Sequence, residues 1–163
     1  MIIGNGDLAS VLPESDTLTF FASGVSDSSC DSEIEFNREI ELLKNCRAGG
    51  YNKRLVYFSS LSIYYKDSPY TKHKKYMEML VRTSFTNFTI IRLGNIDWGT
   101  NPKTIINHFR NSPTLKIWEG TRYIINKEEF LHWINLIPNF NTEMNLTGQL
   151  MTTKQIYNKY RNE

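Results

Sequence analysis

The sequence has few of the residues that would point to a secreted, membrane-spanning or strongly charged protein. Its 163 residues include only two cysteines, Cys30 and Cys46, which lack the spacing of metal ligands. No apolar run is long enough to span a bilayer, and the start of the chain shows no cleavable signal. We therefore expect a cytoplasmic protein with reduced thiols and no membrane partner.

The sequence also has no large excess of either charge, because its 19 Lys and Arg are nearly balanced by 17 Asp and Glu, which gives a formal net charge of +2. This balance provides no general attraction to nucleic acid, so the basic cluster at residues 72–75 does not make nucleic-acid binding the favoured function. The three histidines share no ligand spacing. We therefore expect neither a nucleic-acid partner nor a metal site.

The chain has enough apolar material for one substantial core, with 40% hydrophobic and 13% aromatic residues. It shows no internal repeat, no low-complexity tract and no linker. A single domain over residues 1–163 is therefore predicted. Its last part, from about residue 100 to 163, is less regular and is expected to form a small C-terminal lobe.

Short apolar runs alternate with helical patterns along the first hundred residues. The predicted strands are residues 1–3, 18–22, 54–60 and 89–94, and the predicted helices are a brief one ended by Pro13, one from Ile34 to about residue 48, and one over 70–84. Strands that read as continuous apolar runs between helices are typical of a parallel sheet covered on both faces. The fold class is therefore α/β.

The C-terminal lobe is predicted from weaker patterns. These indicate a helix over 104–109, strands over 115–118 and 122–125, a helix over 128–137, and a last helix capped by Thr152 or Thr153.

Tyr70 and Lys74 lie one turn apart on the same face of the predicted helix over 70–84. An ammonium in this position favours the phenolate form of a tyrosine, which can then remove a proton from a substrate hydroxyl. The strand before this helix ends in Ser59 and Ser60, which adds hydroxyls to the same region. The alternative is that residues 72–75 form a solvated helix face and that Tyr70 is an ordinary packing residue.

Gly4, Gly6 and Ala9 fit a Gly-x-Gly-x-x-Ala pattern between the first strand and the brief helix. Glycines at this spacing allow a tight turn and the close approach of the backbone to a pyrophosphate at a helix N-terminus. A plain turn from strand to helix explains the same residues equally well.

Four segments in this order resemble the extended short-chain dehydrogenase/reductase family, which includes NAD-dependent nucleotide-sugar epimerases and dehydratases. They are the glycine turn, residues 20–26, residues 58–74 and residues 92–99. The resemblance implies a Rossmann-like, doubly wound sheet, NAD or NADP as cofactor, and a nucleotide sugar or other small-molecule substrate. It makes Ser60 the hydroxyl that orients the substrate, Tyr70 the acid/base and Lys74 its partner.

The resemblance also assigns binding residues by position. The cofactor-binding residues are Gly4, Gly6, Ala9, Ser23, Gly24, Ser59 and Gly94. Asn95 follows the strand whose exit faces nicotinamide and substrate. Arg122 lies in a segment, residues 119–124, that resembles the one whose arginine contacts the sugar-nucleotide diphosphate, a role that suits a guanidinium. Arg122 can equally be a surface residue.

One departure from the family concerns the second strand. A dinucleotide fold normally carries an acidic residue there, about 20 residues after the glycine turn, to bind the adenosine ribose. Residues 20–26 resemble the family's fourth strand instead, so the second and third strands are missing, and Asp16 is poorly placed to replace the acid. We therefore predict that the first strand lies at or next to the edge of the sheet and that dinucleotides bind weakly.

Two functions from different classes fit the sequence. One is a minimal nucleotide-sugar epimerase/dehydratase-like oxidoreductase that uses Ser60, Tyr70, Lys74 and NAD(P). The other is a non-catalytic Rossmann-like module for binding or assembly, which the missing strands favour. A homodimer is expected in either case, because apolar edge strands favour association and family members pair through the helices beside the sheet. Tyr76, Met77 and Leu80 are the candidate face.

Overall fold

The elements of the fold follow the alternation in the sequence. The computed structural model describes residues 1–48, 53–111 and 117–161. In chain order the elements are β1 (Ile2–Ile3), the 3-10 turn η1 (Ala9–Val11), β2 (Leu18–Phe21), α1 (Glu33–Ala48), β3 (Arg54–Ser60), the 3-10 turn η2 (Leu61–Tyr64), α2 (Pro69–Ser84), β4 (Phe88–Leu93), β5 (Asn95–Ile96), α3 (Ile105–Asn111), β6 (Thr121–Ile125), α4 (Lys127–Asn135), β7 (Thr142–Leu146), β8 (Gln149–Thr152) and α5 (Thr153–Tyr160). None of the helices within these ranges is long and apolar enough to cross a membrane.

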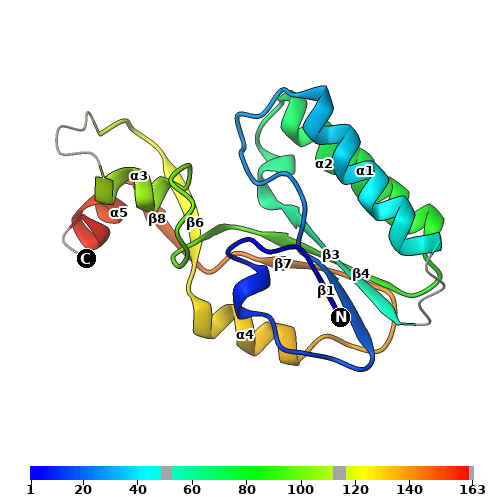
Figure 1. Cartoon of the computed structure of the whole chain (residues 1–163). Helices are drawn as coiled ribbons and strands as arrows, with labels where there is room; N and C mark the ends of the chain where they lie inside the picture. Colours follow the sequence, from blue (N-terminus) through cyan, green and yellow to red (C-terminus); the bar gives the residue numbers. More distant parts are fainter. Residues whose placement is uncertain (49–52, 112–116, 162–163) are drawn as a thin grey trace.

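A five-stranded, fully parallel sheet in the order β1-β2-β3-β4-β7 forms the larger part of the molecule. Helices α1 and α2 cover one face, and η1 and α4 cover the other (Figure 1). Covering both faces explains why the strands read as continuous apolar runs. The predicted parallel α/β sheet is confirmed, and β1 lies at its edge as predicted.

Each face of the large sheet has its own apolar core. Tyr57 and Phe21 pack with Met77 of α2 on one face, and Phe58 packs with Phe130 of α4 on the other. Met77 is fully buried in the first core. Its proposed place in a dimer face was therefore wrong, because its helical spacing reflects packing against the sheet.

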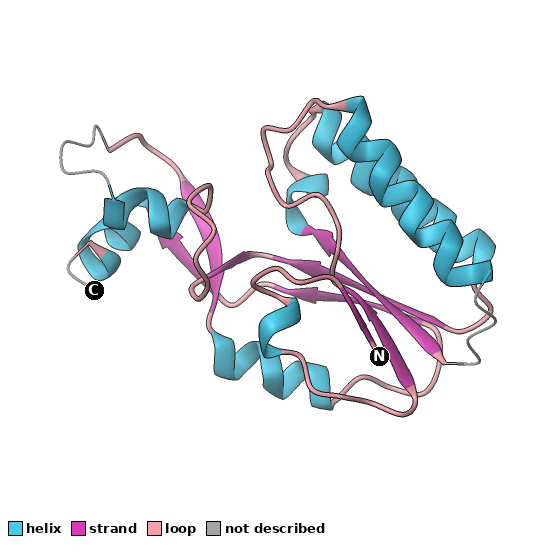
Figure 2. Ribbon diagram, viewed as in Figure 1, coloured by secondary structure: helices cyan, strands magenta, loops and turns pink. Residues whose placement is uncertain are grey.

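The small lobe is a second, three-stranded sheet in the order β5-β6-β8, with α3 and α5 packed beside it (Figure 2). The chain enters it through Gly94, between β4 and β5. A Cβ on Gly94 would lie 2.8 Å from the carbonyl oxygen of Tyr123 and 3.0 Å from that of Thr147. Glycine is therefore required by the close crossing of the backbones, whatever else binds there.

The lobe was predicted less accurately than the large sheet. All three predicted helices form, and the Thr152 hydroxyl caps α5 by accepting a hydrogen bond from the Gln155 N–H (3.2 Å). In the strand predicted over 115–118, the first two residues lie outside the described ranges, and Ile117 and Trp118 are not in a strand. Strands β5 and β8 of the lobe were not predicted, because they are short and carry polar residues at exposed positions. Strand β7 was not predicted either, and it belongs to the large sheet, against which α4 packs, although both fall within the lobe predicted over residues 100–163.

Candidate functional site

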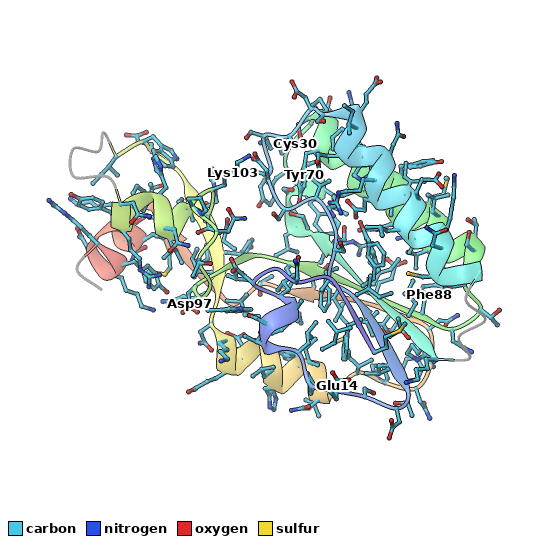
Figure 3. The ribbon with its side chains drawn as sticks, in the orientation of Figure 1. Glu14, Cys30, Tyr70, Phe88, Asp97 and Lys103 are labelled. Carbon is cyan, nitrogen blue, oxygen red and sulfur yellow. The ribbon has the colours of Figure 1, made fainter. Side chains whose placement is uncertain are left out.

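A cavity of about 760 Å³ lies at the carboxyl edge of the large sheet, where it is lined by residues of both the sheet and the lobe. Ligands of open parallel sheets bind outside the carboxyl ends of the strands, so this is the expected place for a site. Figure 3 shows Tyr70 and, from the lobe, Lys103 near each other at this edge. The predicted site residues that line the cavity are Gly6, Gly24, Ser59, Ser60, Tyr70, Lys74, Gly94, Asn95 and Arg122.

Ser60 ends β3 and caps η2. Its Oγ accepts a hydrogen bond from the Ser62 N–H (3.2 Å) and lies 2.8 Å from Ser62 Oγ. Both serines line the cavity. The end of the strand therefore presents a pair of hydroxyls, of which the sequence identified only Ser60.

Tyr70 is held at the start of α2 by a capping box. The Ser68 Oγ accepts a hydrogen bond from the Thr71 N–H (3.3 Å), and the Thr71 Oγ1 accepts one from the Ser68 N–H (3.0 Å). The Tyr70 side chain is nearly buried yet lines the cavity. Its hydroxyl makes no hydrogen bond within the part of the chain that the structure describes, so it is available to a ligand.

Lys74 lies one turn further along α2, with its ammonium 5.8 Å from the centre of the Tyr70 ring. The ammonium donates to Glu39 Oε1 (3.0 Å) and to the Tyr57 hydroxyl (3.3 Å). Ser60, Tyr70 and Lys74 thus line one cavity. Lys74, however, already has a carboxylate partner that the sequence did not indicate.

Glu39 reaches from α1 into the space between α1, α2 and β3, where it is fully buried. It accepts hydrogen bonds from the Val25 N–H and the Tyr57 hydroxyl (2.7 Å each), and His73 Nε2 lies 3.0 Å away. Burial alone would raise the pKa of Glu39, but the Lys74 charge and these hydrogen bonds hold it well below its usual range. Burial and the Glu39 charge raise the pKa of Tyr57 well above its usual value. The cluster therefore holds Glu39 as a carboxylate.

Only part of the predicted cofactor set reaches the cavity. Gly6, Gly24, Ser59 and Gly94 line it, whereas Gly4, Ala9 and Ser23 do not. The Ser59 Oγ is buried and has no hydrogen-bond partner within the described ranges. Because this oxygen is enclosed, the hydroxyl itself is not open to the cavity, which other atoms of Ser59 line.

The glycine turn has a structural role inside the chain. Gly4 has a φ of +126°, and a Cβ there would lie 2.5 Å from the carbonyl oxygen of Ala22. The turn leads into η1, which has only three residues, and not into the helix that binds pyrophosphate in a dinucleotide fold. The Asp7 carboxylate accepts hydrogen bonds from the N–H groups of Thr100 (3.0 Å) and Asn101 (3.1 Å). The turn therefore anchors a loop of the lobe.

The two halves of a dinucleotide fit this site unequally. Ser60 and Tyr70 line the end of the cavity where the hydroxyls of a nicotinamide ribose would need partners. On the adenosine side, β1 is the edge strand, and Asp16 lies before β2, at the end of the sheet opposite the cavity. The described residues thus fit the nicotinamide half of NAD(P). For the adenosine half, the described sheet has no strand beyond β1 that would enclose it.

The lobe contributes polar and cationic groups to the cavity. Asn95 donates to the Tyr123 carbonyl oxygen (3.1 Å). Lys103 pairs with Asp27 (2.7 Å), and this hydrogen bond is the main cause that lowers the pKa of Asp27 to about 2. Arg122 donates to the carbonyl oxygen of its neighbour Thr121 and has no carboxylate partner among the described residues. No three His, Cys, Asp or Glu side chains in those residues are placed to hold a metal ion.

Sequence reasoning missed Glu39, although a signal for it was present. Phe36, Ile40 and Leu43 form the apolar stripe of α1, and Glu39 falls within the same stripe. A charged residue on a buried helix face needs a partner, because burying an isolated charge is costly. The stripe could therefore have predicted a buried pair, but not the identity of the partner.

Comparison with solved structures shows which fold this is. The Bordetella bronchiseptica enzyme WbmG in complex with NAD and UDP matches with a TM-score of 0.68 and 17% identity, over 87% of this chain and 54% of that chain. The UDP-glucose 4-epimerase of Thermotoga maritima with UDP-glucose matches with a TM-score of 0.66 and 16% identity, over 89% of this chain and 60% of that chain.

A third structure, the UDP-N-acetylglucosamine 4-epimerase of Methanobrevibacter ruminantium in complex with UDP-N-acetylmuramic acid, has a TM-score of 0.63 and 17% identity, over 87% of this chain and 58% of that chain. This chain therefore spans little more than half the length of these proteins. No family model matches the sequence, and no curated protein is significantly similar to it. The fold is a Rossmann-like α/β sheet in the shortened form that the sequence predicted.

Proposed function

We propose that the chain is a minimal nucleotide-sugar epimerase/dehydratase-like oxidoreductase that binds NAD(P) and its substrate in the cavity at the carboxyl edge of the sheet. The observation that carries this proposal is the convergence of Ser60, Tyr70 and Lys74 on one cavity of about 760 Å³. Similar structures support the ligand class, because WbmG is in complex with NAD and UDP and the Thermotoga maritima enzyme is with UDP-glucose.

The residues have distinct roles in this proposal. Tyr70, which lines the cavity, takes the proton of a sugar hydroxyl and later returns it. Ser60, supported by Ser62, orients that hydroxyl. Gly94 and the accessible atoms of Ser59, which line the cavity, would hold the nicotinamide end of the cofactor. NAD(P), when bound, would accept the hydride from the carbon that carries the hydroxyl.

A non-catalytic module for binding or assembly is the second candidate. Two observations favour it: the Lys74 ammonium is paired with Glu39, which weakens its effect on Tyr70, and Asp7 engages a loop of the lobe beside the glycine turn. Such a module would keep the cavity and bind a nucleotide or a nucleotide sugar without turning it over.

Binding and turnover measured separately decide between the two candidates. Calorimetric titration with NAD(H), NADP(H) and a panel of UDP-sugars measures binding, and chromatographic analysis of the UDP-sugar products measures turnover, because an epimerase or dehydratase leaves the cofactor unchanged overall. The enzyme predicts both a bound ligand and turnover that Tyr70→Phe abolishes. Binding without turnover supports the module, and the absence of binding at millimolar ligand overturns both.

We also propose that the chain is cytoplasmic and forms a homodimer through the outer face of α1 and α2. Tyr76 and Met79 of α2 are each 45% exposed, and Ile34 of α1 is 80% exposed. Exposed apolar side chains on neighbouring helices favour association. Sedimentation at high micromolar concentration should give the dimer mass, and a monomer there would overturn this assignment.

A further inference from the structure

We infer that Glu39 determines which ligand group the Lys74 end of the cavity accepts. By neutralising Lys74, it makes this end select an uncharged hydroxyl and gives a phosphate no advantage there. The inference deepens the proposed function and rests on it only for the identity of the ligand, since the neutralisation itself is a property of the chain.

The Glu39 carboxylate has no capacity left for a ligand. Its two oxygens accept from Val25, Tyr57, Lys74 and His73, and its exposure is 0%. A carboxylate has about four acceptor positions, so four donors saturate it. Its role is therefore to fix the groups that surround it.

The Lys74 ammonium has at most one N–H group left to donate to a ligand. An ammonium carries three N–H groups and accepts nothing. One is directed to Glu39 Oε1 (3.0 Å), with Oε2 at 3.3 Å, and another to the Tyr57 hydroxyl, which itself donates to Glu39. What reaches the cavity is thus at most one N–H of an ion pair whose net charge is zero. This arrangement suits a ribose or sugar hydroxyl, which needs a donor but brings no charge.

Gly24 keeps this pair in contact with the cavity. A Cβ at this position would lie 2.7 Å from Lys74 Nζ and 2.8 Å from Glu39 Oε1. The loop after β2 can therefore pass directly over the pair only because it has no side chain here, and Gly24 also lines the cavity. The sequence assigned this glycine to the cofactor, but its closest neighbours are the two charged groups.

Phosphate groups have other cations available to them. Lys66 and Arg122 line the cavity and have no carboxylate partner in the described parts of the chain. A ligand that carries both phosphate and hydroxyl groups would therefore be bound with its phosphates near these two side chains and a hydroxyl at Lys74.

The experiment removes the Glu39 charge and measures the binding of inorganic phosphate at constant ionic strength by calorimetry. Glu39→Gln keeps the size of the side chain and leaves Lys74 as an unpaired cation. We expect phosphate to bind about tenfold or more tightly than to the wild type, as one charge-assisted hydrogen bond is gained. A purely structural role for Glu39 would give no such gain.

Glu78→Gln is the matched control. Glu78 is also a buried carboxylate, paired with Arg92 (2.6 Å), but it does not line the cavity. Its removal should leave phosphate binding unchanged. An equal gain in both variants would overturn the inference, because the effect would then reflect overall charge, and so would the absence of a gain in Glu39→Gln.

The double variant Glu39→Gln/Lys74→Met tests the same point if Glu39→Gln does not fold. It leaves no buried charge unpaired, and such neutral replacements are often tolerated. Phosphate should bind to it as it binds to the wild type, since a neutralised Lys74 contributes nothing to anion binding. Loss of phosphate affinity in the double variant would show that Lys74 is an anion site and would overturn the inference.

NADH and UDP-glucose, titrated into the same proteins, keep the two proposals separate. If the phosphate results are as expected but neither nucleotide binds to the wild type, the proposed function fails while the role of Glu39 stands. If a nucleotide binds to the wild type and the phosphate results go the other way, only the role of Glu39 fails.

Discussion

The two ends of the cavity differ in whether their polar groups are free. At the end formed by β3 and α2, Ser60, Ser62 and Tyr70 line the cavity, and the Tyr70 hydroxyl has no hydrogen-bond partner within the described ranges. At the glycine-turn end, the Asp7 carboxylate is bonded to the loop at Thr100 and Asn101. The comparison teaches that a turn of dinucleotide-binding type can serve the chain itself, while the hydroxyl-rich end remains available for a ligand.

The largest effect on the hydroxyl-rich end is expected from a substitution of Tyr70. Tyr70→Phe removes the one hydroxyl assigned to proton transfer, so turnover of a bound UDP-sugar should fall about 10²–10⁴-fold. Affinity should change by less than about tenfold, because only one neutral hydrogen bond is lost. Tyr65→Phe, which alters another tyrosine on the cavity wall, is the control and should retain turnover. Equal rates in the two variants would remove Tyr70 from the mechanism.

The buried pair at the same end should dominate stability. Lys74→Met leaves Glu39 as an unpaired buried carboxylate, so unfolding by urea should show a loss of about 3–5 kcal/mol. Adding Glu39→Gln should restore most of this loss. Lys72→Met on the exposed face of α2, where the lysine pairs with Asp67 at 3.4 Å, should have little effect. If Lys74→Met were as stable as wild type, Glu39 would not be held as a carboxylate by this pair.

Fragments of NAD should sharpen the comparison between the two ends. Nicotinamide mononucleotide should bind within about tenfold of NAD, because the adenosine half finds no wall beyond β1. NAD itself should bind with a dissociation constant well above the micromolar range, and AMP should not compete. Calorimetry measures all three. Tight NAD(P) that copurifies with the protein would contradict this, and would mean that another segment or a second subunit completes the adenosine site.

At the glycine-turn end, Asp7→Asn should change NAD affinity only slightly, and it should raise the affinity, whereas the changes described above lower activity or stability. The amide oxygen can still accept from Thr100 or Asn101, but one negative charge on the wall of the cavity is gone, which lowers the repulsion of an anionic ligand. NAD affinity should therefore rise a few-fold at low salt, and the gain should shrink as salt increases. Glu14→Gln, an exposed carboxylate after η1, should change nothing. A loss of affinity in Asp7→Asn would mean that the carboxylate contacts the ligand favourably.

The smallest effect is expected from the Asp27–Lys103 pair, which joins the loop after β2 to the lobe. The folded pKa of Asp27 is about 2, below its ordinary 3.8, so the pair stabilises the fold fully above about pH 4 and loses this effect as the pH falls toward 2. Asp27→Asn should cost less than about 1 kcal/mol at pH 6, because Lys103 is mostly exposed. The difference from wild type in urea unfolding should vanish near pH 2. Asp31→Asn on the same loop should show no such pH dependence.

The sequence by itself determined four of the five strands of the large sheet, β1 to β4, and the residues at its hydroxyl-rich end, but not β7. The apolar run over 54–60 and the helical spacing over 70–84 are local patterns, and they correctly predict the strand that Ser60 ends and the helix that carries Tyr70 and Lys74. The edge position of β1 followed from the short segment before β2, which has no room for two further strands.

Only the tertiary structure decided what these groups are bonded to. Lys74 and Glu39 are 35 residues apart, and Asp7 and Thr100 are 93 residues apart, so no local pattern pairs them. The short strands β5, β7 and β8 likewise form because neighbouring strands supply their hydrogen bonds, not because their own residues favour extended chain. Local sequence determines which strand or helix carries a residue. Long-range packing determines which distant residue pairs with its side chain, and whether the side chain stays unpaired.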